Sequence, residues 1–294
     1  MKSPGVGLVG VGLMGHGIAL NIARKGFELT VLEHPGNQPL DQLKALGVKS
    51  VATLPELAAG VDVLVLCVTG SPQVEAILLG EKGALASLKP GAVIIDCSTA
   101  LPDSTERVAA AARAAGLKFI DAPMTRTPKE AAEGRLNLLV GGDKAVLDEC
   151  MPILRTFAEN VTHTGGVGTG HRMKLLHNYV SLGTVALIAE AAACAAGGKV
   201  APDVFVEVLA KGGGGGVALE RLRPYIVDGD ASGLRFFMGN ALKDMGYYVS
   251  MAREAAAAQD IASAVHDTYA SAVASEGMEA LVPQLVTSLQ RGRS

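Results

Sequence analysis

The first part of the chain alternates short apolar runs with longer alanine-rich stretches. The short runs carry valine, isoleucine and leucine at consecutive positions, as expected for strands that are buried on both faces of a sheet. Because the longer stretches have the length of helices, the pattern is typical of a parallel sheet covered by helices. Asp103, followed by Glu106, predicts a capping box at the start of one of them. The predicted strands are Val6–Val9, Leu29–Leu32, Val61–Val68, Val93–Cys97, Phe119–Ala122, Leu136–Val140 and Val161–Thr164, and the predicted helices are Met14–Lys25, Pro72–Leu79, Ser104–Ala115 and Lys144–Glu159.

A cluster of glycines over residues 165–170 ends this alternation, and almost no strand signal follows it. We therefore expect a domain boundary near residue 164. The prediction is an α/β domain with a parallel sheet (residues 1–164), joined by a long helix to an all-α domain (residues 165–294). The predicted helices of the second domain are Arg172–Ala196, Pro202–Ala210, Ala241–Gln259 and Ile261–Ala274. The glycine run Gly212–Gly216 is interpreted as a helix-terminating loop rather than a ligand-contacting one.

Charge and composition narrow the class of protein. Of the 294 residues, 49% are hydrophobic and 19% are charged, which is a globular mixture. A net charge of −3 without any basic block gives no support to nucleic-acid binding. Because the cysteines are far apart, we expect reduced core residues and neither a disulfide nor a metal site. They are Cys67, Cys97, Cys150 and Cys194.

The hydropathy pattern does not predict a transmembrane helix. The one stretch of membrane length, Val180–Gly198, is rich in alanine and contains Glu190, so we interpret it as a buried helix. The first residues, Met1–Gly5, run directly into a predicted strand and leave no room for a signal peptide. We therefore expect a cytoplasmic protein without a membrane partner.

The turn Gly10-Val11-Gly12-Leu13-Met14-Gly15 follows an apolar strand and opens a helix. In this context a G-x-G-x-x-G pattern indicates a dinucleotide-binding turn rather than a purely structural one. Gly10 permits the tight turn, Gly12 lets the backbone approach the pyrophosphate, and Gly15 lets the helix pack closely on the strand. The first helical residues, Leu13 and Met14, then offer free N–H groups to the phosphates.

Further cofactor contacts are expected at the carboxyl ends of the other strands. Glu33 ends the second strand, where an acid would meet the adenosine ribose hydroxyls and repel the extra phosphate of NADP, so we predict NAD as the cofactor, with NADP less favoured. The alternative for Glu33 is an ordinary exposed acid. Cys67 and Val68 are candidates for the adenosine side, and Thr99 is a candidate for the nicotinamide side or a simple turn hydroxyl.

Lys174, Asn178 and Ser181 are spaced i, i+4, i+7 on the long predicted helix and therefore share one face. A lysine, an amide and a hydroxyl on one stripe, beside alanine-rich faces, are unusual for simple packing. Taken alone, Lys174 could equally lie on a solvated helix face. The neighbouring motifs decide between these interpretations.

Motifs that match a known family follow one another across nearly the whole chain. They are Gly10–Gly15, Asp96-Cys97-Ser98-Thr99, Asp121-Ala122-Pro123-Met124 with Gly134 and Gly141-Gly142, Gly165 through Lys174 to Asn178, and Phe237 to Lys243-Asp244. On these motifs the sequence resembles the β-hydroxyacid dehydrogenase family, which includes 3-hydroxyisobutyrate dehydrogenase. Together the motifs are far more specific than a single glycine pattern.

The resemblance implies a Rossmann-like domain, a long connecting helix and a helical domain that assembles into homodimers or homotetramers. It also implies that Lys174 is the catalytic acid/base, that Asn178 helps to hold the substrate, and that Lys243 lies near the nicotinamide ribose. In this chemistry a hydride leaves or reaches a carbinol carbon while the lysine exchanges the proton of the oxygen. A free lysine has a pKa of about 10.4, so burial and the cationic oxidised nicotinamide must lower it for the oxidation direction.

The chain departs from the family pattern after Asp-Ala-Pro. Most members continue with a small Ser-Gly-Gly segment that binds the substrate carboxylate, whereas this chain has Met124 followed by Thr125, Arg126 and Thr127. An arginine adds a planar, charged fork that suits a carboxylate, sulfonate or phosphate. This segment is similar to that of the sulfolactaldehyde reductases of the family. The alternative is that Arg126 points to solvent.

A second departure is His177, which precedes Asn178 where most members have another asparagine. In this respect the helix is similar to 6-phosphogluconate dehydrogenase, but Ser181 stands where that enzyme has a glutamate, and the chain is too short for that enzyme's helical domain. We therefore reject the decarboxylating reaction. His177 is either a substrate contact or an ordinary helix-face histidine.

The leading hypothesis is an NAD-dependent oxidoreductase that interconverts a short β-hydroxy acid and its semialdehyde or aldehyde. Arg126 indicates a second anionic group on the substrate, and an activity like that of the sulfolactaldehyde reductases is the sharpest form of this hypothesis. The alternatives are a 3-hydroxyisobutyrate or tartronate semialdehyde type of enzyme and, from another class, a non-catalytic nucleotide-binding scaffold. An imine reductase is a further alternative. The resemblance implies that such scaffolds and imine reductases replace the lysine, so Lys174 argues against both.

Overall fold

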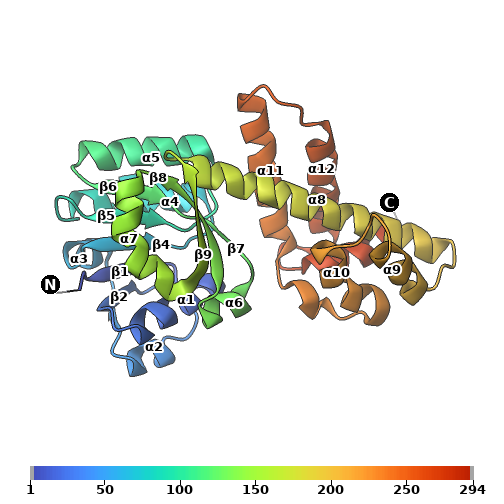
Figure 1. Ribbon diagram of the computed structural model, residues 1–294, viewed down its shortest axis with the longest axis horizontal. Helices are drawn as coiled ribbons and strands as arrows, with labels where there is room; N and C mark the ends of the chain where they lie inside the picture. Colours follow the sequence, from blue (N-terminus) through green and yellow to red (C-terminus); the bar gives the residue numbers. More distant parts are fainter. Residues whose placement is uncertain (1–2, 292–294) are drawn as a thin grey trace. The chain divides into compact units, whose positions relative to one another are not determined.

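The computed structural model describes residues 3–291 and divides the chain into two compact units, Met1–Lys174 and Leu175–Ser294. The division falls inside one helix, α8 (Thr169–Gly197), whose first turns belong to the first unit. The first unit is a sheet with helices, and the second is helical (Figure 1). The predicted fold class is confirmed.

The sheet of the first unit has the strand order β3-β2-β1-β4-β5-β6-β8-β7, with β9 paired to β8. The six strands on the β3 to β6 side run parallel, whereas β8 is antiparallel to β6 and to β7. The chain order reverses between β1 and β4, which is the point where open α/β sheets bind ligands at their carboxyl edge. The strands are β1 (Val6–Val9), β2 (Leu29–Leu32), β3 (Lys49–Val51), β4 (Val63–Leu66), β5 (Val93–Asp96), β6 (Lys118–Asp121), β7 (Met124–Thr125), β8 (Leu136–Gly142) and β9 (Ala158–Gly165).

Apolar side chains alternate between the two faces of the sheet. In β4, Val63 and Val65 pack with the core under α1 and α7, while Leu64 and Leu66 pack with the core that contains α5 residues such as Val108. Both faces are therefore buried, which explains the consecutive apolar residues of the strands. The helices of this unit are α1 (Leu13–Arg24), α2 (Asp41–Ala45), α3 (Leu54–Ala59), α4 (Ser71–Leu79), α5 (Pro102–Ala114), α6 (Pro128–Glu133) and α7 (Lys144–Phe157).

The second unit packs helices around its own core, in which α8 supplies residues such as Leu182, Val185 and Ala189. Tyr269 is fully buried there and donates its hydroxyl to the Leu182 carbonyl at 3.0 Å. The run Gly212–Gly216 joins two helices, as expected. The other helices of the unit are α9 (Pro202–Ala210), α10 (Val217–Asp228), α11 (Met238–Glu254), α12 (Asp260–Glu276) and α13 (Leu285–Gln290).

Within residues 3–291, α8 is the one helix whose length and apolar composition would be sufficient to cross a membrane. Of its most apolar window, 39% is buried within the protein. Its exposed apolar residues include Val180 and Leu187, which are 65% and 63% exposed. The interpretation of residues 180–198 as a buried helix therefore applies to only part of the helix surface.

Several local predictions were wrong. The capping box at Asp103 and Glu106 does not form, because α5 begins at Pro102, whose fixed φ suits the first helical position, and Leu101 is the N-cap residue. A capping box forms instead between Thr127 and Glu130 at the start of α6. Of the four cysteines, Cys194 is exposed and is not a core residue. The elements missed from the sequence are β3, β7, α2, α3, α6, α10 and α13.

Two glycines inside helices should respond in opposite ways to alanine. A Cβ on Gly17 of α1 would lie 2.6 Å from the backbone of Ala131 and Ala132 in α6, whereas a Cβ on Gly183 of α8 would meet only Val265, at 3.9 Å. We expect Gly17→Ala to lower the free energy of unfolding by about 1–3 kcal/mol, as overpacking does. Gly183→Ala should raise it by up to about 1 kcal/mol through helix propensity. Scanning calorimetry of both variants measures this, and equal effects would contradict the close packing of α1 on α6.

Candidate cofactor site and active site

The glycine-rich turn between β1 and α1 has the geometry that a dinucleotide needs. Gly10 has a φ of +96°, and a Cβ there would lie 2.2 Å from the Cys67 carbonyl oxygen. A Cβ on Gly15 would lie 1.9 Å from the Gly10 carbonyl oxygen, but one on Gly12 would meet nothing within 4 Å. Gly10 and Gly15 are thus required by the fold itself. Gly12 instead faces open space at the uncapped start of α1, where Leu13 is 46% exposed and Met14 follows it.

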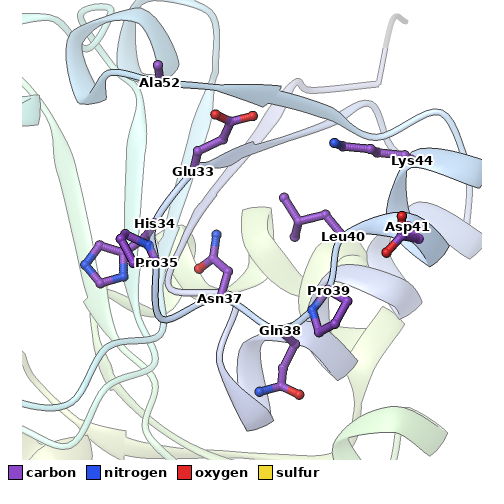
Figure 2. Close-up of a pocket in the computed structure, with 10 residues that line it drawn as sticks. All are labelled: Glu33, His34, Pro35, Asn37, Gln38, Pro39, Leu40, Asp41, Lys44 and Ala52. Atoms are coloured by element: carbon purple, nitrogen blue, oxygen red, sulfur yellow. The ribbon is translucent and has the colours of Figure 1, made fainter.

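A cavity of about 510 Å³ lies beside this turn, at the carboxyl end of β2 (Figure 2). Glu33 lines it, and its carboxylate accepts a hydrogen bond from the Ser50 hydroxyl at 2.7 Å. Asn37 ties the cavity to the glycine turn, since its Oδ1 accepts from the Val11 N–H at 3.2 Å and its Nδ2 donates to the Leu32 carbonyl at 2.9 Å. The lining residues come from the segment after β2, from α2 and from Ala52, which follows β3, and none belongs to the glycine turn itself.

The ends of β4 and β5 are joined by a side chain. The Val68 N–H donates to the Ser98 hydroxyl at 3.1 Å, so the segment after Cys67 is held against the segment before Thr99. Burial raises the pKa of the Cys67 thiol to about 12. This cysteine therefore stays protonated and is not a nucleophile. Thr99 is half-buried at the same edge of the sheet.

A buried carboxylate anchors the start of α8. Asp121, at the end of β6, is fully buried, and its Oδ1 accepts from the Gly168 N–H at 2.8 Å while its Oδ2 accepts from the His171 N–H at 2.9 Å. Burial raises the pKa of Asp121, and the nearby His171 and these N–H groups oppose that effect. The carboxylate therefore accepts hydrogen bonds from free N–H groups at the start of α8, as an N-cap side chain usually does. Here the acceptor comes from a strand that is distant in the sequence.

The His171 side chain is also fully buried and hydrogen-bonded at both ring nitrogens. Its Nδ1 lies 2.8 Å from the Thr105 hydroxyl, and its Nε2 lies 3.1 Å from the Ser98 carbonyl oxygen. Asp96 Oδ2 lies 4.0 Å from Nε2. Sequence reasoning assigned no role to these residues. The signal it could have used is the pair of aspartates that end two adjacent strands, Asp96 and Asp121, which are in register.

Lys174, Asn178 and Ser181 lie on α8 as predicted. Asn178 is buried and donates its Nδ2–H to Asp244 Oδ2 at 2.6 Å, and its Oδ1 lies 3.1 Å from His177 Nδ1. Because a carboxylate only accepts, Asp244 fixes which way the amide points. The Ser181 hydroxyl is 3.5 Å from the Asn178 carbonyl oxygen of its own helix.

Lys243 belongs to the same set of contacts in the helical unit. Its Nζ lies 3.1 Å from Asp244 Oδ1 and 5.4 Å from the centre of the Tyr247 ring. Asp244 therefore contacts both Asn178 and Lys243, and it was not among the predicted site residues although its motif was noted. It gives the predicted substrate-binding amide and the predicted cofactor-binding lysine a common partner.

The predicted anion-binding segment is engaged in internal contacts. Arg126 has a φ of +81°, and its guanidinium pairs with the Glu159 carboxylate and donates to the Arg135 carbonyl. It therefore does not simply point to solvent. Met124 and Thr125 are buried in β7, where the Thr125 hydroxyl accepts from the side-chain amide of Asn137 at 3.1 Å.

Two family models match the chain. The NAD binding domain of 6-phosphogluconate dehydrogenase matches residues 5–165, and the NAD-binding domain of NADP-dependent 3-hydroxyisobutyrate dehydrogenase matches residues 168–288. Among individual proteins, the NAD-dependent L-serine dehydrogenase of Pseudomonas aeruginosa is 30% identical over 88% of this chain and 85% of its own. The 3-sulfolactaldehyde reductase of Escherichia coli is 29% identical over 91% and 89%. The 3-hydroxyisobutyrate dehydrogenase structure from Salmonella typhimurium aligns over 96% and 98% with a TM-score of 0.85 and 28% identity.

The family models and the relatives show an oxidoreductase that uses a nicotinamide dinucleotide and acts on a CH–OH group. The chain belongs to the β-hydroxyacid dehydrogenase family, in the group related to 3-hydroxyisobutyrate dehydrogenase. The resemblance inferred from the motifs and the prediction of an enzyme are thereby confirmed. Across residues 3–291 no cluster of three histidines, cysteines or acids could hold a metal ion.

Two glycine substitutions should separate cofactor binding from folding. Because a Cβ on Gly12 meets open space, Gly12→Ala should fold like the wild type, but its methyl group should obstruct the pyrophosphate and raise the Kd for NADH at least about tenfold. Gly15→Ala should instead melt at a lower temperature, since its Cβ would overlap the Gly10 carbonyl. NADH fluorescence titration and thermal melts measure the pair, with Gly183→Ala as the control. Tight NADH binding by folded Gly12→Ala would place the cofactor elsewhere.

Proposed function

We propose that the chain interconverts a short β-hydroxy acid and its semialdehyde with NAD, and that Lys174 is the general acid/base. The observation that carries the proposal is the position of Lys174, one turn after the point where α8 is hydrogen-bonded to the ends of β5 and β6. Those strand ends belong to the same carboxyl edge as the glycine turn. Asn178 follows Lys174 by one turn on the same helical face.

The residues of the chain divide the chemistry between them. A bound nicotinamide would supply the hydride chemistry, at the carbinol carbon in oxidation and at the aldehyde carbon in reduction. In reduction, the Lys174 ammonium donates a proton to the carbonyl oxygen as the hydride reaches the carbon, and in oxidation the neutral amine accepts that proton. Asn178, whose amide is oriented by Asp244, holds the substrate. His177 and Ser181 are proposed substrate contacts on the same helix.

The proposed cofactor preference is NAD over NADP. Glu33 places a carboxylate at the carboxyl end of β2, the strand next to the one that leads into the glycine turn, and Ser50 donates a hydrogen bond to it. A carboxylate accepts hydrogen bonds from ribose hydroxyls and repels a phosphate at the same position. Cys67, Val68, Thr99 and Lys243 are the further proposed cofactor contacts.

For the substrate, we propose a second anionic group that pairs with Arg126, as a sulfonate would. The guanidinium fork suits such a group, and the Escherichia coli 3-sulfolactaldehyde reductase is among the relatives. Because Arg126 pairs with Glu159, the substrate anion has to replace that carboxylate. A 3-hydroxyisobutyrate or tartronate semialdehyde type of substrate would leave the pair intact. We also propose a cytoplasmic homodimer or homotetramer.

Replacing Lys174 tests the proposed acid/base directly. Lys174→Ala should lower kcat about 10²–10⁴-fold, which is the usual contribution of a positioned acid/base. The Kd for NADH should stay near that of the wild type, because the glycine turn is unchanged. Steady-state kinetics with NADH and a panel of short anionic semialdehydes measure this. Full turnover by Lys174→Ala would refute the mechanism, and no turnover by the wild type on any of them would refute the proposed function.

A matched pair of substitutions tests the anion pocket. Arg126→Ala should lower kcat/KM by about tenfold or more for a substrate with a sulfonate or second carboxylate, since a charge-assisted pair is lost. Glu159→Gln should raise kcat/KM for the same substrate, because it removes the competing carboxylate. Semialdehydes without the second anion are the control. Unchanged preference in both variants would restrict Arg126 to a structural role.

A further inference from the structure

We propose that His171 is a positioning residue for Lys174, because its ring fixes the first turn of α8 to the end of β5 and to α5. The inference rests on the proposed function, in which Lys174 exchanges the proton. His171 precedes Lys174 by three residues, so the two lie one helical turn apart. A shift of the His171 ring would therefore change the position of Lys174, because only one helical turn separates them.

The ring joins three elements. Its Nδ1 meets the Thr105 hydroxyl of α5 at 2.8 Å, and its Nε2 donates to the Ser98 carbonyl after β5 at 3.1 Å, because a carbonyl oxygen only accepts. Ser98 is itself fixed, since its N–H donates to Asp96 Oδ1 at 2.9 Å and its hydroxyl accepts from the Val68 N–H at 3.1 Å. The ring thus connects α8 to a segment that is already held in place, next to the candidate nicotinamide contact at Thr99.

The charges around the ring reinforce this position. Asp96 Oδ2 is buried without a hydrogen-bond partner and lies 4.0 Å from Nε2, and Asp121 Oδ2 lies 3.8 Å from Nδ1. Both carboxylates are fully buried, and buried charges without a partner are costly. His171 is the side chain that lies within reach of both. An apolar residue at this position would remove the ring nitrogens that lie near both aspartates.

The backbone of α8 cannot readily find another position. A Cβ on Gly170 would lie 2.4 Å from the Leu139 carbonyl oxygen and 2.7 Å from Asp121 Oδ2, so the helix start is already pressed against β8 and β6. Within that close packing, the hydrogen bonds of the His171 ring restrict any remaining movement of the first turn of α8. Misplacement by about 1 Å can cost about 100-fold in rate when a catalytic group must meet a reacting atom.

Thr105→Val tests the proposal without removing the ring. The valine keeps the shape of the threonine but loses the hydrogen bond to Nδ1 and the one to the Leu101 carbonyl of the preceding turn. We expect kcat to fall about tenfold while the Kd for NADH stays within about twofold, and Thr105→Ser to restore kcat. Thr156→Val is the matched control, because this buried threonine of α7 bonds only within its own helix, to the Ile153 carbonyl at 2.7 Å. His171→Leu should lower kcat further.

A second readout does not depend on turnover. After reductive ¹³C-methylation, the resonance of Lys174, identified by its loss in Lys174→Arg, should titrate at a different pH in Thr105→Val but not in Thr156→Val. An unchanged kcat and an unchanged titration in Thr105→Val would overturn the positioning role. A shifted titration in a protein whose wild type reduces no semialdehyde would instead refute the proposed function and leave the positioning of the lysine intact.

Discussion

One buried carboxylate determines where the long helix of this protein begins. Asp121 accepts the N–H groups of Gly168 and His171, which are among the donors that a helix start leaves without an internal partner. Because Asp121 ends a central strand, the helix is attached to the sheet at the edge where the glycine turn also lies. The position of Lys174 follows from this attachment. A loss of the carboxylate would leave the helix formed but its start undefined.

After this attachment, α8 presents the proposed functional residues one after another on one face. Lys174 comes one turn after the anchored residues, and Asn178 comes one turn later, where Asp244 fixes the direction of its amide. Asp121 accepts from the backbone of the helix start, and Asp244 accepts from the side-chain amide of Asn178. Because an ionised carboxylate can only accept hydrogen bonds, the groups that contact it must point their N–H toward it.

The sequence predicted those parts of the site whose requirements are local. Gly15 is required by its contact with the Gly10 carbonyl within the same turn, and Gly10 by its positive φ and its contact with Cys67. The shared face of Lys174 and Asn178 follows from helical spacing, whereas their roles come from the family resemblance and stay predictions. The burial of His171 and its contact with Thr105, 66 residues away, depend on tertiary packing, which a single sequence does not display. The same holds for Arg126, whose partner Glu159 is 33 residues distant. Short edge elements such as β3 were missed because three residues carry too little pattern.

Amide hydrogen exchange at Gly168 and His171, compared between the wild type and Asp121→Asn, tests the central claim most directly. An asparagine can accept only one of the two N–H groups, so the account predicts that at least one of these amides exchanges about tenfold faster or more, corresponding to about 1.4 kcal/mol, while the amides of β4 keep their protection. Unchanged exchange at both positions, in a variant that still folds, would show that packing alone sets the start of α8 and would contradict the account.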